Sequence, residues 1–264
     1  MNILLTGSKG YIARGIQNSL GHKYHFTCIN RDVFDLTNYQ DTNTWFKNND
    51  IYFDAVIHTA ISGGNRLKTE NSTILDNNIR MYLNLLECKP YYKKFINIGS
   101  GAETNLNSFY GLSKKMISSS IGDKSNFFNL RVYALFDEKE DSRRFIISNI
   151  LKYSNNINML IHKNKYMDFM YFLDFISIID TYLQNHNMPK SYDCVYNNKY
   201  SLLDIANIIN ELNTYKVNID VLDKNNDVNY IGNYTNIGLD YIGLEQGINQ
   251  VYRKIYNEKN MVRS

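Results

Sequence analysis

The amino-acid sequence predicts an α/β fold in which a doubly wound parallel sheet is followed by a smaller mixed C-terminal lobe. Short apolar runs alternate with longer helical patterns through the first half of the chain, and a glycine-containing turn joins the first run to the first helical pattern. This alternation stops near Ala134. Because alternating strands and helices form a parallel sheet with helices on both faces, we expect one domain over residues 1–134 and a second over residues 135–264. Later segments could return to the first domain.

Five apolar runs of the first half have the length of strands, and three longer segments have helical periodicity. The predicted strands are Asn2–Leu5, Phe26–Asn30, Ala55–His58, Phe95–Ile98 and Phe127–Val132. The predicted helices are Tyr11–Leu20, Ile74–Leu86 and Tyr110–Ile121. In the first of these helices Ile12, Ile16 and Leu20 stand four residues apart, which places them on one face.

Beyond Ala134 the predicted elements are shorter and mixed. Helical patterns are found at Phe145–Leu151, Phe175–Leu183 and Leu202–Leu212. Short extended pieces lie between them, at Met159–Ile161, Asp168–Phe172 and Cys194–Tyr196. Ser201, followed by Asp204, is a predicted N-cap for the last helix.

The composition excludes several classes of protein. With 44% hydrophobic and 21% charged residues, the 264-residue chain can form a core and is not disordered. A net charge of +3 without a dense basic block predicts no nucleic-acid partner. The isolated Cys28, Cys88 and Cys194 predict neither a disulfide framework nor a metal site. No apolar stretch reaches about 18 residues and no signal peptide is visible, so we expect no membrane association and a cytoplasmic location.

The first motif is Thr6-Gly7-Ser8-Lys9-Gly10-Tyr11-Ile12-Ala13, between the first predicted strand and the first predicted helix. Glycines allow a tight turn that brings backbone N–H groups against a pyrophosphate, and the helix N-terminus adds a positive dipole end. A plain turn also explains two glycines, but the position between strand and helix favours a dinucleotide site. The predicted cofactor-binding residues here are Gly7, Lys9, Gly10, Tyr11 and Ile12.

The second motif is Tyr110-Gly111-Leu112-Ser113-Lys114. Tyr110 and Lys114 share one helix face, and a nearby ammonium lowers the pKa of a tyrosine toward neutrality. Tyr110 could then exchange a proton with a sugar oxygen while hydride moves at the same carbon. Ser100, at the end of a predicted strand, could donate a hydrogen bond to that oxygen. We therefore predict Ser100, Tyr110 and Lys114 as catalytic residues.

With these motifs the sequence resembles the extended short-chain dehydrogenase/reductase family, which includes nucleotide-sugar epimerases, dehydratases and reductases. The resemblance extends over nearly the whole chain. It rests on Thr6-Gly7-x-x-Gly10-x-Ile12, Asp35-Leu36-Thr37, Asn78 with Asn84-Leu85-Leu86, Ser100, Tyr110-x-x-x-Lys114, Asn129-Leu130-Arg131 and Asp168-Phe169-Met170-Tyr171-Phe172-x-Asp174. It implies a Rossmann domain that binds NAD(P) over residues 1–134 and a nucleotide-sugar-binding lobe over residues 135–264.

The resemblance also implies roles for single residues. Gly7 and Gly10 would face the pyrophosphate, and Lys114 would also hold the nicotinamide ribose. The other implied cofactor contacts are Asp35 and Leu36 at the adenine and Thr59 and Ala60 along the cofactor channel. Asn78 matches a helix asparagine that supports this site, although a buried polar group without such a role is an equal alternative.

Three departures bear on the activity. Dehydratases of the family carry an Asp-Glu pair after the active-site serine, whereas this chain has Ala102-Glu103, and Glu103 could be a solvated loop residue or touch substrate. GDP-fucose synthases carry a cysteine and a histidine where we align Ala102 and Arg144. Neither residue is suited to the proton transfers of carbon epimerisation, which favours simple 4-keto reduction. The sugar-contacting asparagine of the 4-epimerases is Ala134 here.

The end of the second predicted strand bears on the cofactor. The 4-epimerases have an acidic residue there that holds the ribose hydroxyls of NAD. Arg31 can instead pair with a 2′-phosphate, which favours NADP(H). Asp32 follows directly, so NAD(H) stays possible.

Together these features predict an NADPH-dependent reductase of a nucleotide-linked 4-keto-6-deoxy sugar in polysaccharide or glycan precursor synthesis. The predicted substrate-binding residues are Arg66, Gly101, Ala102 and Arg144. The alternatives are a nucleotide-sugar 4-epimerase with tightly bound NAD, a 4,6-dehydratase and a non-catalytic cofactor-sensing protein.

A homodimer is expected through the helices at Ile74–Cys88 and Tyr110–Ile121, since relatives pair such helices and C₂ dimers are common. The residues predicted for the contact face are Met81, Tyr82, Leu85, Met116 and Ile117. The alternative is that these side chains only pack onto their own sheet.

Overall fold

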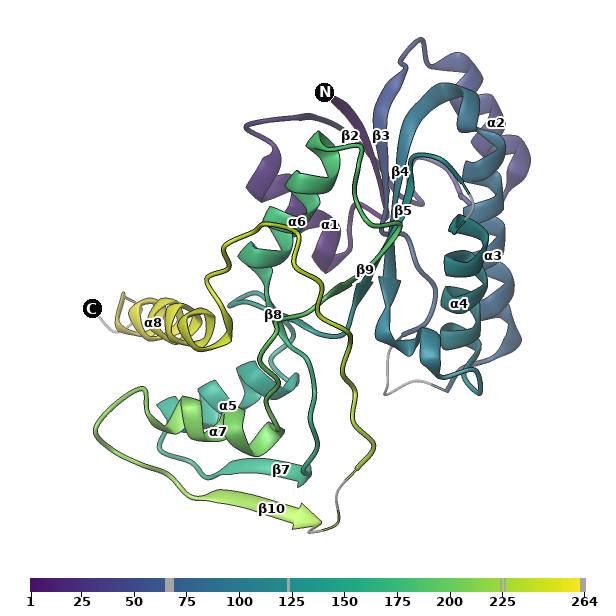
Figure 1. Ribbon diagram of the computed structural model, residues 1–264. Coiled ribbons are helices and arrows are strands. Elements are labelled where there is room, and N and C mark those ends of the chain that lie inside the picture. The colour runs from purple at the N-terminus through teal and green to yellow at the C-terminus, as the bar shows by residue number, and fades with distance from the viewer. Residues whose placement is uncertain (65–68, 123, 224, 226, 262–264) are drawn as a thin grey trace. The chain divides into compact units, whose positions relative to one another are not determined.

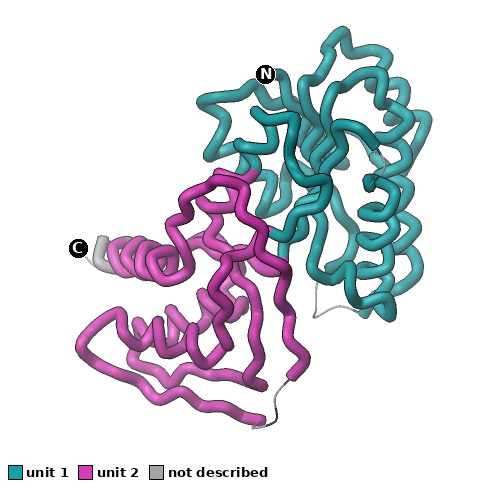
Figure 2. The backbone as a smooth tube through the Cα atoms, in the orientation of Figure 1, with its two compact units in different colours: residues 1–132, 179–193 teal, residues 133–178, 194–264 magenta. Residues whose placement is uncertain are grey.

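The computed structural model describes residues 1–64, 69–122, 124–223, 225 and 227–261. The chain divides into two compact units (Figure 2). Unit 1 contains residues 1–132 and 179–193, and unit 2 contains residues 133–178 and 194–264. The chain therefore leaves unit 1 after residue 132 and later returns to it with a segment of the second half.

Unit 1 is built around a six-stranded sheet with the strand order β2-β1-β3-β4-β5-β9 (Figure 1). Its strands are β1 (Asn2–Thr6), β2 (His25–Ile29), β3 (Phe53–His58), β4 (Tyr92–Ser100), β5 (Phe127–Val132) and β9 (Ser191–Cys194). The first five pair in parallel. The chain runs outward from β1 to β2 and then continues on the other side of β1 with β3. Ligands of such sheets bind at this switch point, beyond the carboxyl ends of the strands.

Helices connect these strands and cover both faces of the sheet. They are α1 (Tyr11–Leu20), α2 (Tyr39–Asn48), α3 (Ser72–Glu87) and α4 (Phe109–Ile121), with the short 3₁₀ helices η1 (Lys89–Tyr91) and η2 (Gly101–Thr104). The helices α2, α3 and α4 lie on one face and α1 on the other (Figure 1). The predicted α/β fold with a doubly wound parallel sheet is thereby confirmed.

The main core of unit 1 lies between the sheet and the helices α2, α3 and α4. Leu4, Val56 and Phe95 supply it from neighbouring strands. The helices supply the buried side chains Phe46, Met81, Tyr82, Leu85, Ile117 and Ile121. The prediction that Met81, Tyr82, Leu85 and Ile117 form an outer contact face is therefore wrong, because these side chains face their own sheet. Of the predicted contact residues only Met116 is exposed.

The returning segment closes the far edge of the sheet. The N–H of Asn129 in β5 donates to the Lys190 carbonyl oxygen just before β9. Lys94 of β4 is buried, and its ammonium donates to the carbonyl oxygens of Tyr182, Leu183 and Asn185 at the end of α6 (Phe172–Gln184). These bonds satisfy both the buried cation and the last carbonyl groups of the helix.

Unit 2 is a small mixed α/β structure with two parallel two-stranded sheets, β10-β7 and β6-β8. Its elements are β6 (Leu135–Phe136), α5 (Phe145–Ser154), β7 (Met159–Lys163), β8 (Met170–Tyr171), the start of α6, α7 (Leu202–Asn210), β10 (Ile219–Asp223) and α8 (Leu244–Met261). The predicted N-cap of α7 is confirmed, since Ser201 and Asp204 form a capping box. Across the described part of the chain, no helix is both long and apolar enough for a membrane span.

The structure adds elements that the sequence analysis did not predict, namely α2, β6, β10, α8 and the two 3₁₀ helices η1 and η2. The pattern of α2 is weak because only Thr42 and Phe46 are buried in it. The predicted extended piece at Asp168–Phe172 contains only the two-residue strand β8, and α6 begins already at Phe172. The strand expected at Cys194–Tyr196 lies earlier, at Ser191–Cys194, and belongs to the large sheet.

Candidate active site

The turn after β1 forms a cradle at the N-terminus of α1. Gly7 has a φ of +65°, and a Cβ there would lie 2.7 Å from the Ala60 Cα. The Gly10 N–H donates to the Gly7 carbonyl oxygen at 2.8 Å, and Gly10 itself is the N-cap of α1. No side chain of the described residues caps this helix, so the first turn of the helix, at Ile12, can bind an anion. The cradle fits the pyrophosphate of a nicotinamide dinucleotide.

A hydrogen-bond cluster ties the carboxyl ends of β1 and β3 together. The Thr6 hydroxyl lies 2.9 Å from His58 Nδ1 and accepts from the N–H groups of Thr59 and Ala60, each at 3.2 Å. The Thr59 hydroxyl donates back to the Thr6 carbonyl oxygen at 2.6 Å. Burial, reinforced by the positive charge of Lys114, lowers the pKa of His58 to about 3, so this imidazole is neutral at neutral pH.

Side chains after β2 hold the glycine turn in place. The Asn30 side chain donates to the Ser8 hydroxyl at 3.1 Å, and its Oδ1 accepts from the N–H of Asp32 at 2.8 Å. The Asp32 carboxylate forms an ion pair with Lys9. Arg31 is exposed beside this pair. Asp32, the acidic residue directly after Arg31, is thus paired with a lysine, while Arg31 is exposed.

The Asp35-Leu36 segment is a structural turn in this protein. The Asp35 carboxylate accepts from the N–H of Thr37 at 2.9 Å. The side chain of Leu36 is buried in the core, and its carbonyl oxygen accepts from Asn84 of α3 at 2.8 Å. The sequence analysis placed Asn84 in a motif but did not assign it this role of fixing the turn.

Asn78 links the segment after β3 to α4. This buried amide accepts from the Ser62 N–H at 2.8 Å and donates to the Ser62 carbonyl oxygen at 3.0 Å. It also donates to the Ser113 hydroxyl at 2.9 Å, which donates to the Tyr110 carbonyl oxygen at 2.7 Å. Asn78 is therefore a buried helix polar group that positions the helix of the candidate catalytic pair.

Helix α4 carries both Tyr110 and Lys114, as the spacing predicted. The Lys114 ammonium lies 5.9 Å from the centre of the Tyr110 ring and donates to the Ile98 carbonyl oxygen of β4. Burial lowers the pKa of Lys114 to about 8, and the negative charge of Glu103 opposes this shift. The backbone of Gly64 lies against the same ring, since a Cβ there would be 3.1 Å from Tyr110 Cε2.

Ser100 is the last residue of β4 and the N-cap of η2. Its hydroxyl oxygen accepts from the Ala102 N–H at 3.1 Å, a bond that leaves the hydroxyl proton for another acceptor. Gly101 and Ala102 form the start of η2, which packs against α4: a Cβ on Gly111 would lie 2.5 Å from the Ala102 carbonyl oxygen. Because Gly111 has no side chain, η2, which follows Ser100, can pack closely against α4, which carries Tyr110.

Glu103 is buried, with 4% of its surface exposed. Its Oε1 accepts from the Ser100 N–H at 3.1 Å and from Asn129 of β5 at 3.0 Å. The alternative that Glu103 is a solvated loop residue is therefore wrong. The physical reason is the capping box with Ser100, which turns the carboxylate back toward the strand end.

Two further residues were predicted to bind substrate, Arg66 and Arg144. Arg66 lies outside the described residues. Arg144 belongs to unit 2, where it is the N-cap of α5 and donates to Glu140 Oε1 at 3.1 Å. Burial raises the pKa of the Glu140 carboxyl to about 7, against the effect of this guanidinium.

Known protein structures share this architecture. A GDP-L-fucose synthetase from Naegleria fowleri is 16% identical, with a TM-score of 0.78 over 98% of this chain and 94% of that one. A GDP-mannoheptose C4 reductase from Campylobacter jejuni with NADP bound is 15% identical, with a TM-score of 0.80 over 97% and 98%. A UDP-glucose 4-epimerase from Thermotoga maritima with UDP-glucose is 16% identical, with a TM-score of 0.78 over 98% and 100%.

No curated protein sequence matches the chain. The family model described as "NAD dependent epimerase/dehydratase family" does match, over residues 3–197, a range that includes the glycine cradle, Ser100, Tyr110 and Lys114. The resemblance noted from the motifs is thereby confirmed. The chain belongs to the NAD-dependent epimerase/dehydratase family.

Proposed function

We propose that the protein is an NADPH-dependent reductase of a nucleotide-linked 4-keto-6-deoxy sugar. The observation that carries this proposal is that the two described residues at the second and third positions after Ser100 supply no second acid–base pair. Ala102 offers only a methyl group, and the Glu103 carboxylate is bound to the Ser100 N–H and to Asn129. Epimerisation at carbon and elimination of water both need further proton-transfer groups, whereas carbonyl reduction needs one donor.

In the proposed mechanism the residues of unit 1 bind the cofactor and protonate the product. Gly7, Gly10 and the first turn of α1 would hold the pyrophosphate, and Lys114 the nicotinamide ribose. When bound, the nicotinamide supplies hydride to the carbonyl carbon. Tyr110 donates its proton to the carbonyl oxygen, and the Lys114 ammonium stabilises the resulting phenolate. The Ser100 hydroxyl donates a hydrogen bond to the same oxygen.

NADP(H) is the proposed cofactor because of the charges after β2. Arg31 is exposed and can form a bidentate contact with a 2′-phosphate. Asp32, which could otherwise hold the ribose hydroxyls of NAD, is paired with Lys9. Unit 2 is proposed to contribute the nucleotide-sugar-binding residues, among them Arg144.

The test is to incubate the purified protein with a panel of 4-keto nucleotide sugars in heavy water. Loss of NADPH absorbance with one product reduced at C4 and no enzyme-dependent deuterium at C3 or C5 would support the proposal. A protein that retains NAD on purification and interconverts 4-hydroxy sugars without added reductant would be an epimerase instead. Deuterium at C3 or C5 would reveal the proton transfers that the proposal denies.

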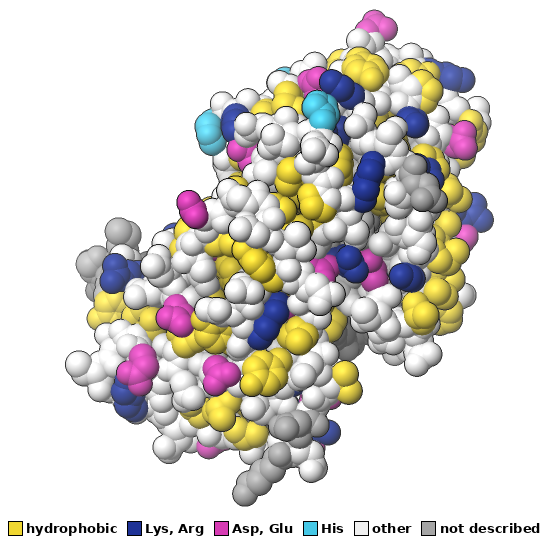
Figure 3. All heavy atoms as spheres, viewed as in Figure 1, with side chains coloured by type: hydrophobic (Ala, Val, Ile, Leu, Met, Phe, Trp, Pro, Cys, Tyr) yellow, Lys and Arg dark blue, Asp and Glu magenta, His cyan; other side chains and the backbone are white. Residues whose placement is uncertain are grey.

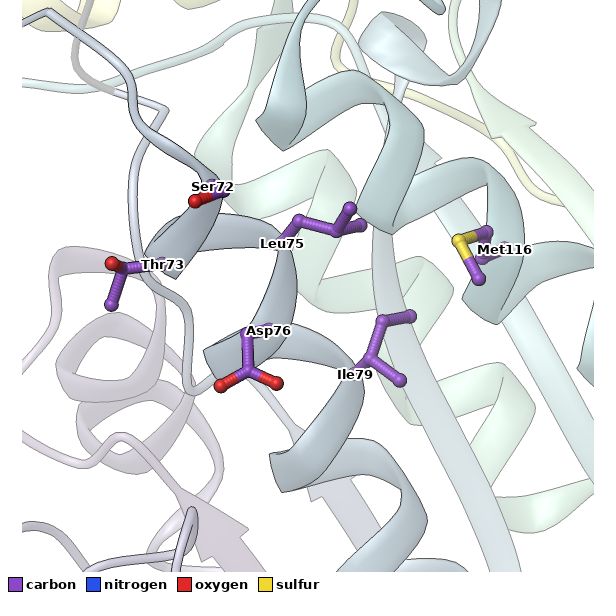
Figure 4. A pocket seen from close by; sticks show the side chains of 6 residues that line it. All are labelled: Ser72, Thr73, Leu75, Asp76, Ile79 and Met116. Atoms are coloured by element: carbon purple, nitrogen blue, oxygen red, sulfur yellow. The ribbon is translucent and has the colours of Figure 1, made fainter.

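We also propose a homodimer through the outer side of α3 and α4. Leu83 and Met116 are 46% and 47% exposed there. Leu75 and Ile79 of α3 and Met116 of α4 line a hollow of about 540 Å³ (Figure 4). Hydrophobic side chains follow this side of unit 1 in the space-filling view (Figure 3). Apolar surface of this kind suits a self-complementary contact between two copies.

A further inference from the structure

Two buried charges approach the end of β4 from different elements. Glu103 of η2 and Lys114 of α4 are 4% and 5% exposed. Lys114 donates to the Ile98 carbonyl oxygen, and Glu103 Oε1 lies 2.5 Å from the position of a Cβ on the next residue, Gly99. The two side chains therefore reach consecutive residues of one strand, and the missing side chain of Gly99 makes room for the carboxylate.

We propose that Glu103 is a positioning residue for the reaction: its carboxylate keeps the Lys114 side chain cationic and fixes the backbone that carries Ser100. This inference rests on the proposed roles of Ser100, Tyr110 and Lys114. Glu103 acts through these residues and does not itself exchange a proton with the sugar.

Neutral groups hold the carboxylate in place. Asn129 of β5 donates to Glu103 Oε1 at 3.0 Å and to the Ser118 hydroxyl of α4 at 3.1 Å. Asn97 of β4 donates to the Asn129 side-chain oxygen at 2.7 Å. Because amide donors carry no net charge, they orient the carboxylate without cancelling its negative charge.

The negative charge of Glu103 acts on Lys114, because the nearest other cation is paired with a different carboxylate. Among the described residues, Lys114 interacts with Glu103, with the neutral His58 of β3 and with Tyr110 on its own helix. Arg131 of β5 comes within 3.9 Å of Glu103, but it has a carboxylate of its own in Asp193 at 2.7 Å. A buried ammonium without an opposite charge is costly, and burial already lowers the pKa of Lys114 to about 8.

The first test is a double-mutant cycle on unfolding of the full chain without cofactor or substrate. Glu103→Gln removes the charge and keeps an Oε1 acceptor for Ser100 and Asn129, although it loses the longer bond of 3.3 Å from Asn129 to Oε2. Lys114→Met removes the cation at similar volume. Near pH 7 the effect of Glu103→Gln on the unfolding constant should differ by at least about threefold between the wild type and the Lys114→Met background. The coupling should vanish above about pH 10, where the folded Lys114 side chain is neutral.

A parallel cycle that combines Glu103→Gln with Arg131→Met decides whether Glu103 interacts with Lys114 or with Arg131. Coupling to Arg131 but not to Lys114, or coupling to Lys114 that is the same at both pH values, would overturn the inference.

The second readout is kinetic: Glu103→Gln should lower kcat about tenfold, with the KM for NADPH within about twofold, because the cofactor contacts stay intact. If no keto sugar is reduced, the proposed function fails, and the unfolding cycle still tests the charge pair independently.

Discussion

Asn78 and Ser113 are joined by a hydrogen bond of 2.9 Å between the side chain of α3 and the hydroxyl of α4. The same amide binds both backbone polar groups of Ser62, and the Ser113 hydroxyl continues to the Tyr110 carbonyl oxygen. One buried side chain thus sets the spacing between the segment after β3 and the helix that presents the proposed proton donor.

Asn78→Ala should lower the free energy of unfolding by about 1–3 kcal/mol, because the polar groups of Ser62 and the Ser113 hydroxyl lose their partner. Turnover should fall more than stability alone explains, since the position of Tyr110 depends on this link. Urea unfolding and steady-state kinetics measure the two effects. Asn77→Ala, which removes a neighbouring amide from the same helix, is the control, and equal effects of the two variants would contradict a special role for Asn78.

Tyr110→Phe should reduce turnover by at least about a hundredfold, the usual scale for loss of a general acid. The fold should survive, because the ring and its contact with Gly64 are retained. Tyr52→Phe, at an exposed position, controls for loss of a hydroxyl. Near-normal turnover of Tyr110→Phe would remove this residue from the mechanism.

Arg31→Ala should weaken NADPH binding by roughly tenfold to a hundredfold, as expected for loss of a charge-assisted contact of about 1.5–3 kcal/mol. NADH binding should change little, because it lacks the 2′-phosphate. Fluorescence titration of the two cofactors measures the difference. Arg80→Ala, at an exposed arginine of α3, should change neither affinity. An equal loss for NADPH and NADH in Arg31→Ala would show that Arg31 does not bind the 2′-phosphate.

The stability of the protein should fall as the pH decreases from about 6.5 to about 3. The pKa of the folded-state His58 is lowered to about 3, so in this range the unfolded chain binds a proton that the folded chain does not. The resulting slope is at most about 1.4 kcal/mol per pH unit, and above pH 6.5 His58 contributes none. His58→Gln should flatten the dependence, whereas His25→Gln, at an exposed position, should leave it unchanged. Parallel pH profiles for wild type and His58→Gln would refute the assignment.

Light scattering at micromolar concentration should give a mass near twice the 30.9 kDa of one chain. Met116→Lys places a charge on the exposed side of α4 and should shift the protein toward the single-chain mass. The isolated fold should be unaffected, because this side chain is half exposed. A single-chain mass for the wild type would exclude the proposed dimer.

The sequence analysis succeeded where periodicity and local spacing determine structure. The bounds of α1 and β5 agree with the predicted segments residue for residue, and the spacing of Tyr110 and Lys114 placed both on one helix. Strands buried on both faces read as short apolar runs, which made the central strands recognisable.

The role of Glu103 could not be predicted, because it depends on three-dimensional neighbours. Along the chain it is one acidic residue in a polar loop. Its burial needs Asn129 from the adjacent strand and the free space at Gly99, and neither contact leaves a periodic pattern. The same holds for Lys94, a lysine inside a buried strand whose partners lie 88 to 91 residues further along the chain.

The return of residues 179–193 to unit 1 has a consequence for how the chain folds during synthesis. The first 132 residues contain the cradle, Ser100, Tyr110 and Lys114, but the edge of β5 and the ammonium of Lys94 find their partners only in the later segment. A nascent chain that ends before residue 179 therefore carries an open strand edge and a lysine buried without acceptors. Unit 1 is expected to mature only after about three-quarters of the polypeptide has been made, and a fragment cut after residue 132 should aggregate rather than fold.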